Sequence, residues 1–168
     1  MNRTHSIVDS PIGPLTVVCE DGALVFLHMD QAKYPPKDFG ARVDLGRSPL
    51  HAATQEQLGE YFAGERTTFD LPVAPRGEGF HQTVWTLLQR IAYGERRSYG
   101  QLAEELGDKR LAQAVGWANG RNPIAIVIPC HRVLGADGSL TGYAGGLDRK
   151  RFLLELEEPA AVSAGRLF

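Results

Sequence analysis

The spacing of apolar residues changes near residue 75, and this change limits the chain to few architectures. The first thirty residues predict short strands at Ser6–Asp9, Leu15–Cys19 and Leu24–Met29, separated by turn sequences. From Phe80 onward the apolar residues recur at the period of a helix instead. Residues 75–79, which contain one proline and two glycines, form the expected linker. We therefore expect an α/β (α+β) chain in which a strand-rich part precedes a helix-rich part.

The N-terminal part, residues 1–74, is expected to be a small antiparallel sheet with one helix. Residues 31–47 combine Pro, Gly and charged residues and predict a surface loop. An amphipathic helix is predicted from Ser48 through Ala63, with Gly64 as its end signal. Residues Phe69–Val73 are predicted to return as a strand.

The C-terminal part, residues 80–168, is expected to be a mostly helical domain that resembles a winged helix-turn-helix and carries a reactive cysteine. Two short helices joined by a glycine-containing turn are typical of the helix-turn-helix, although many such pairs never touch DNA. The predicted elements are a helix from Phe80 to Ile91, a helix at Tyr99–Leu106 capped by Ser98, a helix at Arg110–Asn119, a buried strand at Ile124–Ile128, a glycine-rich turn or wing at Leu134–Tyr143 and a helix at Arg149–Glu158.

A cysteine ends the apolar run at 124–128, and a candidate base follows it directly in Pro129-Cys130-His131-Arg132. Burial keeps a thiol protonated and inert unless another group removes its proton. Because neighbouring residues of an extended segment point to opposite sides, His131 would act on Cys130 through a bend or a bridging water. The pair alone is also compatible with a buried cysteine that only packs in a core.

Composition indicates a globular chain of 168 residues, of which 43% are hydrophobic. Cys19 and Cys130 are far apart, and the set His5, Cys19 and His28 lacks the spacing of a metal site. The first residues lack the apolar core of a signal peptide, and no apolar run has membrane-spanning length. We therefore expect a cytoplasmic protein with reduced thiols, no metal and no membrane partner.

The charges are distributed unevenly along the chain, although the net charge is only -2. Residues 1–78 hold 7 Lys and Arg against 11 Asp and Glu, and residues 79–151 hold 10 against 6. The positive excess therefore lies in the part that contains Cys130. This excess permits binding to DNA, and ordinary scatter of charge explains it equally well.

The cysteine segment closely resembles the O6-alkylguanine-DNA alkyltransferases, also called methylated-DNA-protein-cysteine methyltransferases. The match runs without a gap from about Phe80 to Glu157, and a weaker one lies at 9–13. It rests on Asn122-Pro123, on Ile126-Val127-Ile128-Pro129-Cys130-His131-Arg132-Val133 and on Gly142-Tyr143-Ala144-Gly145-Gly146. The resemblance implies a monomeric protein without cofactor that accepts the alkyl group of O6-alkylguanine, or of O4-alkylthymine, once.

The resemblance also implies roles for individual residues. Cys130 matches the alkyl-accepting nucleophile, His131 the water-mediated base and Glu157 the carboxylate that orients the histidine ring. Asn122 matches the asparagine that ties together the turn and helix around the site. The flipped base would contact Tyr99, Val133, Tyr143, Ala144, Gly145 and Gly146.

In this family the helix that corresponds to 110–119 enters the minor groove of double-stranded DNA, and small residues allow its close approach. Here the small residues are Ala112, Ala114, Gly116 and Ala118, and they are equally compatible with close packing against another helix. Gln113 stands where relatives place an arginine that fills the gap left by the flipped nucleotide, and Arg110 is a candidate to compensate by reaching a phosphate. Cooperative binding along DNA is left open.

Three alternatives remain on the residues alone. The chain could bind alkylated DNA without reacting, it could be a thiol hydrolase that uses Cys130, His131 and Glu157, or it could be a winged-helix regulator whose Cys130 senses oxidants.

Overall fold

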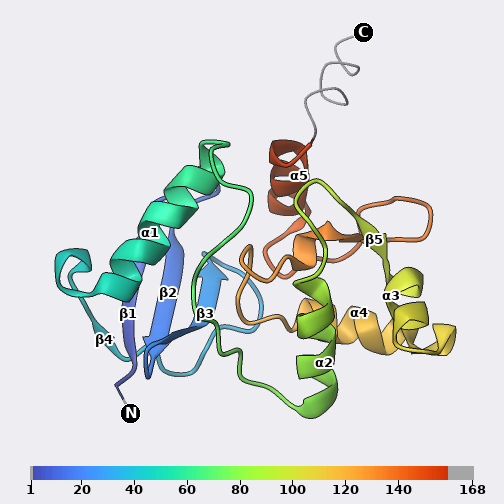
Figure 1. The fold of residues 1–168 in the computed structure, drawn as a ribbon, viewed down its shortest axis with the longest axis horizontal. Helices are drawn as coiled ribbons and strands as arrows, with labels where there is room; N and C mark the ends of the chain where they lie inside the picture. The colour runs from blue at the N-terminus through green and yellow to red at the C-terminus, as the bar shows by residue number, and fades with distance from the viewer. Residues whose placement is uncertain (1, 159–168) are drawn as a thin grey trace, which may run out of the picture.

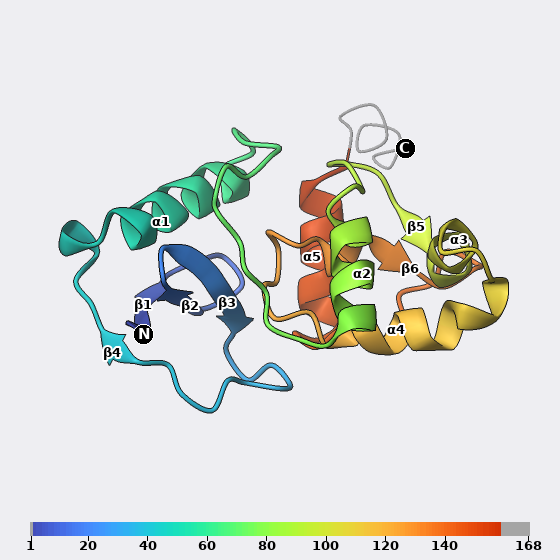
Figure 2. The same ribbon diagram turned by 60° about the horizontal axis from the view of Figure 1, so that its bottom comes forward.

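The computed structural model of the chain describes residues 2–158 and has two parts that lie side by side (Figures 1 and 2). The first part is a sheet covered on one face by α1 (Pro49–Phe62). The second part is built from α2 (Gly79–Leu88), α3 (Tyr99–Glu105), α4 (Ala112–Gly120) and α5 (Leu147–Leu156). One buried apolar cluster runs through both parts, so the two share a core. Among the helices of residues 2–158, none is long and apolar enough to cross a membrane.

The sheet has the strand order β3-β2-β1-β4. The predicted strands are found as β1 (Thr4–Val8), β2 (Leu15–Glu20) and β3 (Ala23–Met29), and they pair antiparallel. Asp21 and Gly22 connect β2 to β3 in a two-residue hairpin, with φ of 51° and 79°. Asp-Gly is favoured there because both turn residues of a type I′ hairpin need positive φ.

Two expectations about the N-terminal part were wrong in detail. Residues 31–47 are not only a loop, because they contain β4 (Ala41–Arg42) and a 3₁₀ turn at Leu45–Arg47, and β4 makes the sheet mixed by pairing parallel to β1. Phe69–Val73 is not a strand: only Val73 forms a bridge, to Leu24 of β3. The backbone of this segment meets the edge of β3 only at Leu24, through two hydrogen bonds, where a ladder was expected.

The predicted helix between Ser48 and Ala63 is confirmed as α1. Ser48 and Ala63 are its flanking residues, and Pro49 occupies the first turn, where its missing N–H has no intrahelical partner in any case. Its buried face consists of His51, Thr54, Leu58 and Tyr61, which recur every three or four residues as one stripe of a helix. This spacing packs the helix on the sheet and carries Tyr61 toward the second part.

The C-terminal helices are confirmed with shifted ends. Ser98 caps α3 and forms a reciprocal capping box with Gln101. Gly107, with φ of 100°, lies just beyond the C-terminal end of this helix and stops it. The predicted helix at 110–119 starts as a separate 3₁₀ turn, Lys109–Leu111, before α4 begins. The short strands β5 (Arg97–Ser98) and β6 (Val133–Leu134), which were not expected, pair in parallel beside α3.

The expected strand at 124–128 was also wrong, because the segment is a buried turn. Ile124 forms one bridge to Leu27 of β3, and Ile126 then takes a positive φ of 72°. The side chain of Asn122 closes the turn: its Oδ1 accepts from the Ile124 N–H at 3.0 Å, and its Nδ2 donates to the Ile128 carbonyl at 2.7 Å. An unbroken apolar run fits a buried strand or a buried turn equally, so its composition could not distinguish them.

Candidate active site

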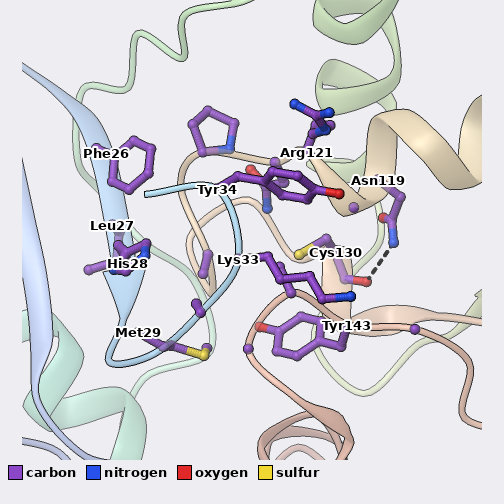
Figure 3. A pocket seen from close by; sticks show the side chains of 18 residues that line it. Phe26, Leu27, His28, Met29, Lys33, Tyr34, Asn119, Arg121, Cys130 and Tyr143 are labelled. Atoms are coloured by element: carbon purple, nitrogen blue, oxygen red, sulfur yellow. Dashed lines mark hydrogen bonds between the residues drawn. The ribbon is translucent and has the colours of Figure 1, made fainter. Parts of the chain in front are cut away.

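Cys130 begins a 3₁₀ turn, Cys130–Arg132, directly after the turn that Asn122 closes. Its side chain lines a cavity of about 50 Å³ between β3, the segment after it, α4 and the glycine-rich loop before α5 (Figure 3). The residue is 5% exposed. The cysteine is therefore enclosed by chain segments from both parts of the molecule.

Burial raises the pKa of the Cys130 thiol above its ordinary value. Three neighbours act in the opposite direction, namely the side chain of Asn122, the charge of Lys150 and the hydroxyl of Tyr143. The resting thiol is protonated at neutral pH, since burial has the largest effect. These neighbours are placed to favour the thiolate once a base removes the proton.

His131 is fully buried, and its Nε2 lies 2.7 Å from Oε2 of Glu157. Burial lowers the pKa of the imidazole, which outweighs the opposing effect of Glu157. The ring is therefore neutral at pH 7, and the carboxylate partner assigns its proton to Nε2. Nδ1 has no hydrogen-bond partner among residues 2–158, so its lone pair can accept a proton. The ring has the protonation state that a general base requires.

Glu157, at the C-terminal end of α5, accepts three hydrogen bonds from two side chains besides His131: two come from Arg132, at 2.7 Å and 3.0 Å, and one comes from the hydroxyl of Tyr61. Burial acts to raise the pKa of Glu157, but the hydrogen bonds from His131 and Arg132 and the charge of Arg132 outweigh it and lower the pKa to about 2. The carboxylate stays ionised and fixes the orientation of the histidine.

Lys150 of α5 is a site residue that the sequence did not reveal. It is fully buried, and its Nζ donates to the carbonyl of Thr141 at 2.9 Å. Burial lowers the pKa of Lys150 to about 8, although the neighbouring Cys130 acts to raise it. Its charge faces the cysteine while its hydrogen bond holds the glycine-rich loop. No local signal distinguishes this lysine from Arg149 and Arg151 beside it.

Of the residues expected to contact a base, Tyr143, Ala144 and Gly145 line the Cys130 cavity. Tyr99 lines an adjoining hollow instead, and its hydroxyl accepts a hydrogen bond from Thr141 at 3.0 Å. Gly146 precedes α5 with φ of 94°, and Val133 is a buried residue of β6. Gly145 has little room, since a Cβ there would lie 2.3 Å from the sulfur of Met29.

The residues expected to face DNA lie on or just before α4. Gln113 and Ala114 are exposed, while Ala112 and Gly116 are half-buried. Arg110 precedes the helix on the 3₁₀ turn and is 91% exposed, but its guanidinium is paired with Asp108 at 2.9 Å. The helix also carries one large exposed side chain among these small ones, that of Trp117, which is 59% exposed.

Two family models match the chain. The 6-O-methylguanine DNA methyltransferase ribonuclease-like domain matches residues 4–75, and the DNA binding domain of the same enzyme matches residues 79–159. A methylated-DNA–protein-cysteine methyltransferase of Mycolicibacterium paratuberculosis is 52% identical over 165 residues, 98% of both chains. One from Methanosarcina acetivorans is 44% identical over 91% of this chain and 97% of its own.

Solved structures show the same relationship. The Mycobacterium tuberculosis O6-methylguanine methyltransferase superposes with a TM-score of 0.82 at 46% identity, over 96% of this chain and 98% of its own. The structure of Mycobacterium tuberculosis OGT in complex with DNA gives 0.81 at 47% identity, over 95% and 97%. Fold and site thus define a thiol-dependent DNA alkyltransferase. The chain belongs to the methylated-DNA–protein-cysteine methyltransferase family.

Proposed function

We propose that Cys130 is the residue that accepts the methyl group in this family's reaction, the transfer from O6-methylguanine in DNA to a protein cysteine. The chain repairs DNA directly by this transfer and binds DNA to do so. One observation carries the assignment to Cys130: the residue that follows it directly, His131, is a buried, neutral histidine held by an ionised carboxylate. Cys19 is buried too, and burial raises its pKa to about 11.

The proposed reaction begins with removal of the thiol proton. A bridging water passes the proton from Cys130 to Nδ1 of His131, and Glu157 stabilises the imidazolium that results. The thiolate then attacks the methyl carbon: a C–S bond forms, the C–O6 bond breaks, and its electron pair leaves with guanine, whose anion takes up the proton held by His131 through water. The product is a thioether, which has no carbonyl for water to attack, so each molecule reacts once.

The same proposal covers the remaining site residues. A guanine stacked in the duplex is out of reach, so the nucleotide must be flipped into the site. Tyr99 would donate to the base, Gly145 and Gly146 would wall the pocket, and the carbonyls of Cys130 and Val133 would accept from the guanine amino group. Asn122 would hold the turn beneath Cys130, for which its two hydrogen bonds to that turn are the support.

For the DNA we propose entry of α4 into the minor groove, with Gln113 at the gap left by the flipped nucleotide. The exposure of Gln113 and Ala114 supports this placement. The ion pair with Asp108 reduces what Arg110 contributes as a free cation. We further propose a monomer in the reducing cytoplasm, since the reaction consumes a free thiol.

We also propose the domain boundaries 1–74 and 80–168, joined by 75–79. The two family models support them, because one ends at residue 75 and the other begins at residue 79, the first and last residues of this linker. Residues 159–168 of the proposed C-terminal domain lie outside the described part of the chain.

A titration tests the proposed function. Increasing amounts of a duplex that contains O6-methylguanine are mixed with a fixed amount of protein, and repaired guanine is counted. We expect repair to stop at one guanine per protein molecule, and Cys130→Ser to repair none while Cys19→Ser repairs normally. Repair far in excess of protein would contradict the proposal and would favour a hydrolase that turns over.

A further inference from the structure

The cavity that Cys130 lines is too small for the base that the proposed function requires. Its volume is about 50 Å³, whereas a cavity that accepts benzene, a single ring, measures about 150 Å³. Guanine has two fused rings and carries the alkyl group in addition. Some part of the cavity wall must therefore move before the alkyl carbon can reach the sulfur.

A second hollow lies directly outside this cavity. It measures about 220 Å³, and Tyr99 and Trp117 line it together with several residues that also line the inner cavity. Cys130 lines only the inner cavity. Tyr34 and Arg121 belong to both linings and so lie at the boundary between the two spaces. In Figure 3 the ring of Tyr34 lies between the guanidinium of Arg121 and the side chain of Cys130.

One direct contact and two contacts of neighbouring residues hold Tyr34 at this boundary. The guanidinium carbon of Arg121 lies 3.9 Å from the centre of the Tyr34 ring and 4.8 Å from that of Trp117, so the arginine bridges two aromatic rings. The neighbouring Lys33 N–H donates to the carbonyl of Ala144 at 3.1 Å, which ties this segment to the glycine-rich loop.

These contacts are few and are exposed to solvent. Tyr34 is 46% exposed, and cation–π contacts at exposed sites are weak. The segment that carries it is also under local backbone strain, because Gln31 and Tyr34 have φ of 60° and 58°, a region that residues with a side chain seldom adopt. Tyr34 is therefore held in place by interactions that can readily be exchanged for others.

We propose that Tyr34, clamped by Arg121, is a gate that separates the outer hollow from the Cys130 cavity and limits entry by the size of the incoming group. The proposal rests on the proposed function, since it takes Cys130 as the acceptor. In the closed state the sulfur is shielded from any group as large as a nucleobase, because the cavity measures only about 50 Å³. The observed rate of alkylation is then the rate of the open state multiplied by the fraction of molecules that are open.

The test compares two reagents that alkylate cysteine without DNA. O6-benzylguanine as the free base has to pass the gate, whereas iodoacetamide is small. The full chain is used in five forms: wild type, Tyr34→Ala, Arg121→Met, Tyr34→Phe, which keeps a ring on Arg121, and Lys37→Ala, which changes an exposed residue of the same segment that lines neither space. Peptide mass spectrometry follows the modification of Cys130 with time, and Arg121→Met removes the clamp from the other side.

We expect Tyr34→Ala and Arg121→Met to accelerate benzylation of Cys130 about five- to tenfold, and to change its reaction with iodoacetamide less than about twofold. Tyr34→Phe and Lys37→Ala should both stay within about twofold of wild type with either reagent. An unchanged benzylation rate in Tyr34→Ala and Arg121→Met would overturn the gate. Equal acceleration of both reagents would also overturn it, because Tyr34 would then act on the thiol itself.

Failure of the proposed function gives a different result. In that case O6-benzylguanine leaves Cys130 unmodified in wild type and in every variant, while iodoacetamide still modifies it. N-phenylmaleimide, a bulky thiol reagent, then replaces O6-benzylguanine as the probe. A faster reaction of Tyr34→Ala with this reagent but not with iodoacetamide would support the gate, and equal rates for the two proteins would overturn it.

Discussion

Replacement of Glu157 by glutamine tests the carboxylate at the centre of the site, because it keeps the shape of the side chain and removes its charge. Glu157 accepts hydrogen bonds from His131, Arg132 and Tyr61. The drop of its pKa from 4.5 to about 2 corresponds to about 3 kcal/mol of folding free energy while the carboxylate is ionised. The variant also leaves the buried guanidinium of Arg132 without its counter-charge, a change that typically costs about 3–5 kcal/mol.

We therefore expect Glu157→Gln to lower the free energy of unfolding by at least about 3 kcal/mol at pH 7, which is about 6–12 °C in Tm for a chain of this size. Because the pKa of Glu157 is lower in the folded chain than in the unfolded chain, its stabilisation is present above about pH 4.5 and is lost as the pH falls toward about 2. The difference between wild type and variant should narrow over the same range.

Urea unfolding at several pH values, together with thermal unfolding at pH 7, measures both effects. The control is Glu104→Gln, which breaks an exposed ion pair of 3.0 Å with Lys109 and should change stability by less than about 0.5 kcal/mol. If Glu157→Gln were as stable as this control at pH 7, or if its deficit stayed constant into the acid range, the carboxylate would not have the role derived from its contacts.

Three further changes have defined outcomes. Lys150→Gln removes a buried charge that lowers the pKa of Cys130, so the pH profile of its reaction with iodoacetamide should move to higher pH, whereas Arg151→Gln, at an exposed site, should leave the profile in place. Tyr61→Phe should lower the free energy of unfolding by about 1–3 kcal/mol, because a hydrogen bond to a buried carboxylate is lost; urea unfolding that matches wild type would contradict this. Gln113→Arg should speed repair of a methylated duplex and leave the reaction with free O6-benzylguanine unchanged, since only the duplex requires flipping; equal changes in both single-turnover rates would show that Gln113 does not act at the gap.

The sequence predicted elements best where a local signal has a single physical meaning. Asp21-Gly22 predicted its hairpin because few residues accept positive φ, and Ser98 predicted the start of α3 because its side chain caps the free N–H groups. The helix between Ser48 and Ala63 followed from the spacing of its apolar face.

Signals that fit several structures led to errors. The apolar run at 124–128 is buried as expected, but one polar side chain, Asn122, bends it into a turn. Strand pairing between residues far apart in the sequence could not be predicted either. The two-residue strand β4 pairs with β1, which lies more than thirty residues earlier in the chain. Tertiary context decided each of these segments.

The site shows the same division between local and distant information. Resemblance to a family pointed to His131 and Glu157, and the structure brings them into contact across 26 residues of sequence. Lys150 was missed because a lysine in a charged helix suggests solvent exposure. Tyr61 was missed because nothing in the sequence of the N-terminal part indicates its contact with Glu157. Trp117 and Tyr34 were missed because an aromatic residue gives no sign in sequence of which cation it stacks on.

The central claim is that Cys130 accepts the alkyl group, and peptide mapping after reaction tests it most directly. The protein is mixed with an equimolar duplex that contains O6-methylguanine, and digested peptides are analysed by mass spectrometry. We predict a single methyl group on the peptide that contains Cys130 and an unmodified peptide for Cys19. A methyl group on Cys19, or guanine repaired with no methylated cysteine peptide, would contradict the account.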